Sequence, residues 1–141
     1  MSMIKFDIIT IFPEIFNSYF NESIIRRAKE KKKIKIKIID LRKFSTDKHK
    51  KVDDKPYGGG PGMVFKIEPL VKAIGSILGS KVKGQRSKVM LFSAGGRQFN
   101  SKMAKEWAKK YDQIVMIAGH YEGVDERIKS IIRDSGFMIQ E

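Results

Sequence analysis

Residues 3–12 read MIKFDIITIF, and this stretch decides the fold class. It is rich in β-formers and almost continuously apolar, which is typical of a strand buried on both faces of a parallel sheet. Residues 88–93 (KVMLFS) and 113–118 (QIVMIA) have the same character. Residues 34–39 (IKIKII) alternate isoleucine with lysine instead. They predict a half-exposed strand toward an edge of the sheet, where lysines also discourage pairing with another chain.

Helical periodicity lies between and after these strands, at residues 22–31, 68–78, 100–111 and 125–133. In the first helix, Ile24, Ile25 and Ala28 are expected to share one face. In the third, Asn100 suits an N-cap, and Trp107 recurs at helical spacing with other apolar residues. We therefore expect Trp107 in the core rather than as a stacking platform. The order of elements predicts an α/β fold with a mainly parallel sheet flanked by helices.

The composition indicates one globular domain with a polyanionic partner. The 141 residues carry 29 lysines and arginines against 16 acids, a net charge of +13. A surplus of this size favours nucleic acid as the partner, although a lysine-rich proteome would also raise it. The chain has no cysteine, and His49 and His120 form no metal-binding pattern. Without a signal peptide or an apolar run of membrane-spanning length, a soluble cytoplasmic protein is expected.

Residues 57–63 (YGGGPGM) contain four glycines and a proline within a lysine-rich chain. A phosphate-binding P-loop needs a lysine and a hydroxyl residue after its last glycine, but Met63 and Val64 stand there. The dinucleotide-binding pattern fails as well, because the third glycine of that pattern is missing. Two interpretations remain, a close-packed turn or a surface on which a flat group such as a base lies against bare backbone.

Two other glycine-bearing segments follow buried strands, residues 92–99 (FSAGGRQF) and 118–127 (AGHYEGVDER). Ligands of open α/β sheets gather at the carboxyl ends of strands, so these segments predict a small-molecule cleft. Tyr121 offers a ring and a hydroxyl there, and Glu122 offers a carboxylate. Glu122 has an alternative role as an exposed acid that balances Arg127 or nearby lysines.

Five motifs together resemble one family, the bacterial tRNA (guanine-N1)-methyltransferases of the SPOUT class. They are DIITIFPEIF, ESIIRRA, DLRKFSTDKHKKVDDKPYGGGPGMVFK, LFSAGGRQFN and IAGHYEGVDERI, in this order along nearly the whole chain. The resemblance implies a trefoil-knotted α/β domain that works as a homodimer. It also implies transfer of a methyl group from S-adenosylmethionine to N1 of guanine 37, next to the anticodon of tRNA.

The resemblance also assigns site residues. It implies a donor site lined by Leu91, Phe92, Ser93, Gly119, Tyr121, Glu122 and Gly123. Glu122 matches the family's glutamate that acts in methyl transfer together with a magnesium ion. It implies a receiving surface for the target guanine at Gly58, Gly59, Gly60 and Pro61, with Arg26 as a candidate contact to tRNA phosphates.

The chain departs from the family pattern in two places. Ala94 stands where the family usually has proline, which is a small change. After Glu141 the family continues with a Ser-Ile-Gly-Asp-Tyr segment that passes through the knot and completes the donor site, followed by a tRNA-binding domain. Residues 1–141 are therefore expected to be the N-terminal portion of such an enzyme, with little transfer activity alone. The alternative is a non-catalytic module that associates with RNA or dimerises.

Overall fold

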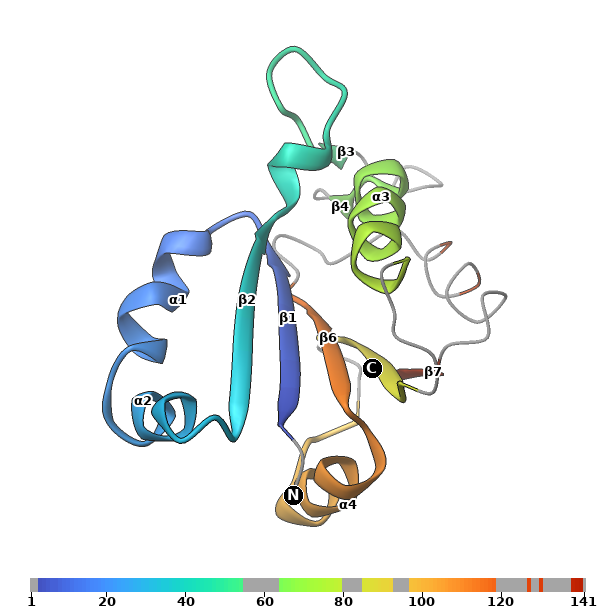
Figure 1. Cartoon of the computed structure of the whole chain (residues 1–141). Helices are drawn as coiled ribbons and strands as arrows, with labels where there is room; N and C mark the ends of the chain where they lie inside the picture. Colours follow the sequence, from blue (N-terminus) through green and yellow to red (C-terminus); the bar gives the residue numbers. More distant parts are fainter. Residues whose placement is uncertain are drawn as a thin grey trace.

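The chain folds around a five-stranded parallel sheet (Figure 1). The computed structural model describes residues 3–54, 64–79, 85–92, 97–118, 127, 130 and 138–140. The strand order is β2-β1-β6-β5-β7, and each neighbouring pair is parallel. The strands are β1 (Ile4–Thr10), β2 (Ile34–Asp40), β5 (Ser87–Leu91), β6 (Gln113–Ile117) and β7 (Met138–Gln140). The parallel α/β fold and the edge position of the strand with alternating lysines are both confirmed.

The predicted helices are present where the structure describes them. The elements outside the sheet are α1 (Pro13–Phe20), α2 (Ser23–Glu30), the 3-10 helix η1 (Leu41–Phe44), the paired β3 (Asp53–Asp54) and β4 (Val64–Phe65), α3 (Ile67–Leu78) and α4 (Ser101–Lys110). Asn100 caps α4 as predicted, its side chain accepting from the Met103 N–H at 2.9 Å. The sequence did not predict α1 or β7. Apart from residues 127 and 130, the helix expected over 125–133 lies outside the described residues.

Helix α3 covers one face of the sheet and builds the larger core. Alternate residues of the strands point to this face, among them Ile9, Val89 and Val115, and all three are fully buried. Leu70 and Ala73 of α3 pack against them. Side chains of a strand alternate between the two faces of the sheet, and α3 carries one apolar stripe. The apolar side chains of one sheet face and this stripe are together sufficient to form the core layer.

Helix α4 covers the opposite face and builds a second, smaller core from Met90, Trp107, Tyr111 and Ile114. Trp107 is buried here, which confirms its predicted core position. The ring of Phe99 lies 5.3 Å from that of Trp107, centroid to centroid. The ammonium of Lys88, a strand residue, lies 4.6 Å above the Trp107 ring.

Helices α1 and α2 contact the edge strand β2 and contain no buried residue. Ile24, Ile25 and Ala28 are expected on one face of α2, and Ile25 and Ala28 are half-buried. Ile24 is 74% exposed. At about 100° per residue, Ile24 and Ile25 stand on opposite sides of Ala28, so Ile24 lies at the solvent edge of the face that contacts the sheet.

Candidate functional site at the carboxyl edge of the sheet

The two glycine-bearing segments leave the sheet side by side. Strands β5 and β6 are parallel neighbours, and their last residues, Leu91 and Ile117, are paired. Phe92 N–H donates to the Ile117 carbonyl at 3.3 Å, and Ala118 N–H donates to the Ile9 carbonyl at 3.0 Å. Three strand ends are thus tied together at the carboxyl edge. The prediction that these segments follow adjacent strands is confirmed.

Leu91 and Phe92 have different surroundings at this edge. The Leu91 side chain is buried in the core beneath α3, so it supports the edge from below. Phe92 is the next residue, just beyond the strand, and 52% of its surface is exposed. An exposed aromatic ring at a strand end offers a flat apolar surface to a ligand. Of the expected donor-site residues, these are the two that the structure describes.

The remaining residues expected around the donor and the guanine lie outside the described residues. They are Ser93, Gly119, Tyr121, Glu122 and Gly123 for the donor, and Gly58, Gly59, Gly60 and Pro61 for the guanine. Their roles stay predictions. The structure does describe the residues next to these segments. They are the carboxyl ends of β5 and β6 and the β3–β4 ladder on either side of the glycine-rich segment.

The glycine-rich segment is enclosed by a short antiparallel ladder. Asp53 pairs with Phe65 and Asp54 pairs with Val64, so residues 55–63 connect β3 to β4. Val52, just before this ladder, is buried in the α3-side core, and its carbonyl accepts from the Lys66 N–H at 2.6 Å. Segment 41–66, whose sequence has no clear helical or strand period, therefore contains η1 and the β3–β4 ladder.

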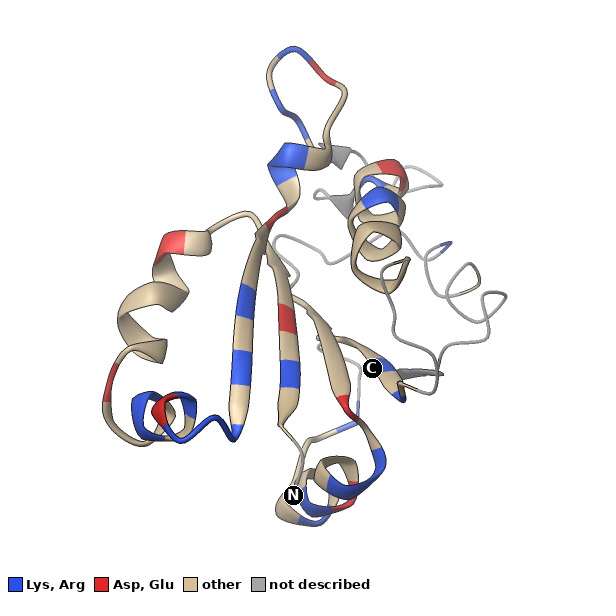
Figure 2. Cartoon of the chain, in the orientation of Figure 1, with Lys and Arg blue, Asp and Glu red and all other residues tan. Residues whose placement is uncertain are grey.

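The sequence reasoning did not single out a basic loop at the same edge. The loop follows η1, and η1 follows the carboxyl end of β2 (Figure 2). The Ser45 hydroxyl donates to the Lys51 carbonyl at 2.6 Å and accepts from the Asp47 N–H at 3.1 Å. The basic residues that it carries or adjoins are Arg42, Lys43, Lys48, Lys50 and Lys51, and all five are exposed. The run DKHKK was the signal available in the sequence.

Arg26 lies away from this edge. It belongs to α2, which ends just before the amino end of β2 (Figure 1). Its guanidinium lies 3.9 Å from the Glu30 carboxylate, and both side chains are largely exposed. The structure therefore does not bring Arg26 together with Leu91 and Phe92. A contact between Arg26 and a tRNA phosphate stays a prediction. It would lie on α2, away from the carboxyl edge of the sheet.

The described segments contain no group of three or more histidine, cysteine, aspartate or glutamate residues that would hold a metal ion. Among the helices that the structure describes, none combines the length and the apolar character needed to cross a membrane. The features that remain at the carboxyl edge are an exposed aromatic ring, two strand ends that lead into glycine-bearing segments, and a basic loop.

Comparisons with known proteins agree on one family. The family model described as tRNA (Guanine-1)-methyltransferase TrmD matches residues 4–140. A tRNA (guanine-N(1)-)-methyltransferase of Mycoplasma mycoides is 53% identical over 130 residues, covering 92% of this chain and 52% of that protein. The protein of the same name from Dictyoglomus turgidum is 50% identical, covering 92% of this chain and 51% of its own length.

A solved structure gives the same result in three dimensions. The tRNA (m1G37) methyltransferase from Aquifex aeolicus superposes with a TM-score of 0.78 at 38% identity, over 92% of this chain and 57% of that one. This likeness supports the SPOUT-type fold that the sequence motifs imply. The chain spans about half the length of the curated relatives that it matches.

Proposed function

The chain belongs to the TrmD family of tRNA (guanine-1)-methyltransferases, and we propose that its protein methylates N1 of guanine 37 in tRNA with S-adenosylmethionine as the donor. The observation that carries the proposal is the match of residues 4–140 to the family model. The arrangement of the carboxyl edge supports it, because β5 and β6 deliver two glycine-bearing segments to one place. Because the matched relatives are about twice as long, the activity is proposed for the protein as a whole.

The reaction requires a methyl donor held beside a deprotonating group. The N1–CH₃ bond forms as the S–CH₃ bond of the donor breaks, and the N1 proton passes to a base or to solvent. We propose that the Glu122 carboxylate acts in this step by holding a cation beside the guanine, because the negative charge that develops on the ring is stabilised by a positive charge or a hydrogen-bond donor. Its carboxylate oxygens suit Mg²⁺, which prefers oxygen ligands and typically binds one or two carboxylates. A magnesium ion held by Glu122 would supply that positive charge.

We propose that two described side chains form a floor and a wall for the donor. Leu91 is buried and fixes the end of β5, while Phe92 exposes its ring beside it. We propose that the backbone of residues 119–123 and of Ser93 completes the donor site. The glycines of 58–62 then admit the target guanine, which has to leave its stack at a cost of about a few kcal/mol.

The basic surface supplies attraction to tRNA that does not depend on base sequence. The net charge is +13, and the loop after η1 places several of these cations at the carboxyl edge, where the guanine is to enter. Contacts between lysines and phosphates release counterions, so tRNA affinity is expected to fall steeply with salt. We also propose a cytoplasmic location, because the proposed substrate is tRNA.

We further propose a homodimer, as the family resemblance implies. Helix α1 has no buried residue, yet Ile15 and Tyr19, one helical turn apart, are 65% and 69% exposed. Phe12, just before the helix, is also exposed. Neighbouring large apolar side chains that the chain itself does not cover favour a partner surface, and a second copy is the partner that the family supplies.

The function is tested first by donor binding. Calorimetric titration of the full-length protein with S-adenosylmethionine is expected to show saturable binding, and a Phe92→Ala variant of that protein is expected to bind several-fold more weakly. Phe99→Ala, at an exposed aromatic on α4's side of the sheet, is the matched control and keeps wild-type affinity. Binding of tRNA without any donor binding would support the alternative, a non-catalytic RNA-associating module.

The methyl-transfer step is tested with radiolabelled donor and two transcripts that differ only in having guanine or adenine at position 37. Label is expected in the guanine transcript alone. Glu122→Gln is expected to lower transfer by at least about 10²-fold, the range of a charge-stabilising group, while donor affinity changes little. Equal transfer to both transcripts would refute the proposed specificity.

A further inference from the structure

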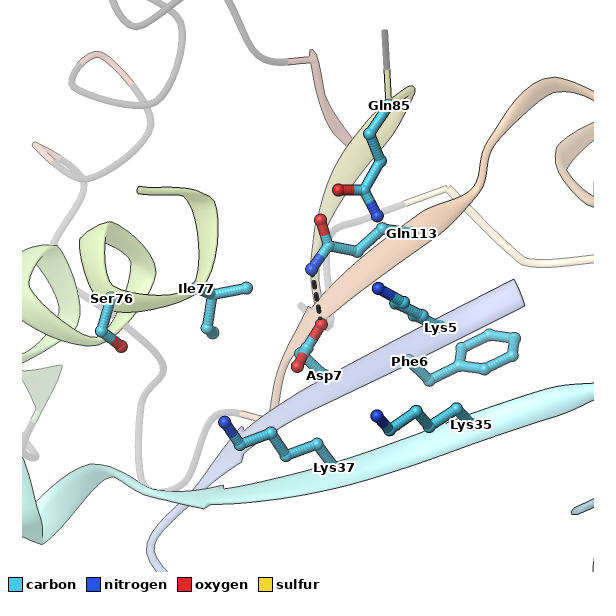
Figure 3. Close-up of a pocket in the computed structure, with 9 residues that line it drawn as sticks. All are labelled: Lys5, Phe6, Asp7, Lys35, Lys37, Ser76, Ile77, Gln85 and Gln113. Carbon is cyan, nitrogen blue, oxygen red and sulfur yellow. Dashed lines mark hydrogen bonds between the residues drawn. The ribbon is translucent and has the colours of Figure 1, made fainter. Parts of the chain in front are cut away.

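A polar pocket lies at the opposite end of the sheet from the candidate methyl-transfer site, on the face that α3 covers only in part (Figure 3). Its volume is about 150 Å³. Nine residues line it: Lys5, Phe6, Asp7, Lys35, Lys37, Ser76, Ile77, Gln85 and Gln113. The strand residues among them stand near the amino ends of β1, β2 and β6. The proposed function uses none of these residues.

The floor of the pocket is a buried chain of polar side chains. Ser87 Oγ donates to Gln113 Oε1 at 2.9 Å, and Gln113 Nε2 donates to Asp7 Oδ2 at 2.7 Å. All three residues are less than 9% exposed. Burying polar groups costs free energy unless they are hydrogen-bonded. The hydrogen bonds among Ser87, Gln113 and Asp7 offset that cost. It also fixes the orientation of the Gln113 amide relative to the Asp7 carboxylate.

The rim of the pocket carries an unfavourable arrangement of positive charge. Lys5 of β1 lies directly opposite Lys35 of β2, and Asp7 lies directly opposite Lys37. Like charges in directly opposite strand positions destabilise a sheet. Figure 3 shows the ammonium ends of Lys5 and Lys35 extending in the same direction. No carboxylate of the described residues forms an ion pair with any of these three lysines.

We propose that the pocket binds a phosphate group between Lys5 and Lys35, with Lys37 alongside. A phosphate there replaces the repulsion between two ammonium groups with two attractive contacts. The phosphate oxygens are strong hydrogen-bond acceptors, and the lysine ammonium groups are charged donors. The polar floor and the small volume suit a single tetrahedral anion better than an apolar ligand.

Two features oppose an anion at this place, and neither outweighs the lysines. Asp7 carries one negative charge but faces Lys37 across the strands and accepts a hydrogen bond from Gln113. The carbonyl end of α3, near Ser76 and Ile77, adds about half a negative charge. Three lysines against these charges leave the pocket positive by more than one unit.

The phosphate has two possible sources. One is the backbone of tRNA, in which case the inference rests on the proposed function and adds an RNA contact remote from the target guanine. The other is a small phosphorylated molecule. The chemistry of recognition is the same for both sources, so the two are separated by experiment.

The first measurement titrates the chain with inorganic phosphate at constant ionic strength, followed by ¹⁵N-resolved NMR and by thermal unfolding. Wild type is expected to show saturable shifts at Lys5 and Lys35. A K35Q/K37Q variant is expected to bind about tenfold more weakly, which corresponds to about 1.4 kcal/mol of binding free energy. The matched control is K102Q/K109Q, which removes two exposed lysines from α4 and keeps wild-type affinity.

The fold of the variant is checked in phosphate-free buffer. There K35Q alone is expected to unfold at the same or a higher temperature than wild type, because it removes the Lys5–Lys35 repulsion. Equal phosphate affinity in K35Q/K37Q and K102Q/K109Q would overturn the proposal, and so would the absence of saturable binding to wild type.

The second measurement replaces inorganic phosphate with tRNA. If the RNA backbone is the source, K35Q/K37Q lowers tRNA affinity and the salt dependence more than K102Q/K109Q does. If the two variants bind tRNA equally while only K35Q/K37Q loses inorganic phosphate, the source is a small phosphorylated molecule. Donor titration is independent of both measurements. Its failure would count against the proposed methyl transfer and not against the phosphate pocket.

Discussion

Lys88 shows how one charged residue can belong to a core. It is 4% exposed, and its ammonium lies 4.6 Å from the ring centre of Trp107 and 5.2 Å from that of Tyr111. Its four-carbon stem fills the space between β5 and α4. K88A is expected to lower the free energy of unfolding by about 2–3 kcal/mol, from lost packing and lost cation–π attraction.

K88M is the matched variant, because methionine keeps most of the volume without the charge. It is expected to stay within about 1 kcal/mol of wild type in urea denaturation. A K88M variant as unstable as K88A would show that the charge, rather than the stem, provides the stabilisation. This role could not be predicted from sequence, since Lys88 appears there as the polar start of an apolar strand.

Asp112 connects the starts of β5 and β6 through Arg86. Its carboxylate accepts from the Arg86 side chain at 3.2 Å and from the Arg86 backbone N–H at 3.0 Å. The hydrogen bond from the Arg86 side chain is the largest cause that lowers the pKa of Asp112 below its ordinary 3.8. A depressed pKa means that the ionised form stabilises the fold, so this stability is present above pH 3.8 and is lost as pH falls through the folded-state pKa.

D112N is therefore expected to be less stable than wild type at neutral pH. The difference between the two proteins shrinks as the pH falls below about 4, where the wild-type carboxylate also becomes neutral. Urea denaturation of both proteins at pH 7, 5 and 3 measures this difference in the free energy of unfolding. E106Q, at an exposed acid on α4, serves as control, and an equal D112N deficit at pH 7 and pH 3 would contradict the argument.

At the scale of elements, the end of α2 contains a residue in a strained conformation. Lys32 has a φ of 56°, in the left-handed region that glycine adopts at little cost. Its N–H donates to the Lys29 carbonyl at 3.0 Å, and the Lys33 N–H donates to the Ala28 carbonyl at 2.9 Å, which is the Schellman pattern. K32G is expected to stabilise the chain by about 0.5–1 kcal/mol, because the steric cost of Cβ is removed.

The neighbouring residue gives a matched control. Lys31 has a φ of −81°, so glycine there relieves no strain and adds freedom to the unfolded chain. K31G is expected to lower the free energy of unfolding by several tenths of a kcal/mol. Thermal and urea unfolding compare the stabilities of the two variants. A K32G protein that is less stable than K31G would exclude the strain at Lys32.

The elements that could be predicted from sequence are those whose pattern follows burial. The strands β1, β5 and β6 are apolar because both of their faces are covered, and β2 alternates because it is an edge. Helix α1 was missed although Pro13 takes its first turn. None of its apolar side chains is fully buried: Ile15 and Tyr19 are exposed, and Phe16 and Phe20 are only half-buried. Strand β7 was missed because its three residues pair with β5 far away in sequence.

At the scale of the whole molecule, the candidate site could be predicted in location but not in detail. Consecutive β5 and β6 are neighbours in the sheet, so their carboxyl ends meet, and Leu91 and Phe92 lie at that edge. The donor-binding role of these two residues stays a prediction. The position of Arg26 relative to this edge could not be predicted from sequence. It depends on the path by which α1 and α2 connect the carboxyl end of β1 to the amino end of β2. The opposed lysines of the phosphate pocket depend on strand register, which the sequence does not specify.

The proposed dimer is also a property of the whole molecule. Ile15 and Tyr19 share one exposed side of α1, and transferring such side chains from water to an interface contributes about 25 cal/mol per Å² of apolar area. An I15K/Y19D variant leaves the described core intact, because neither residue is buried. Its charges become costly only if a second copy covers them.

Sedimentation equilibrium is expected to show a dimer for wild type and a monomer for I15K/Y19D. The matched control is V71K, at an exposed apolar residue of α3 on the other face of the sheet. It is expected to stay dimeric, with unfolding temperatures for all three proteins measured at one concentration because dimerisation itself raises stability. A wild-type monomer at micromolar concentration would refute the dimer. If V71K dissociated and I15K/Y19D did not, the interface would lie on the α3 face instead.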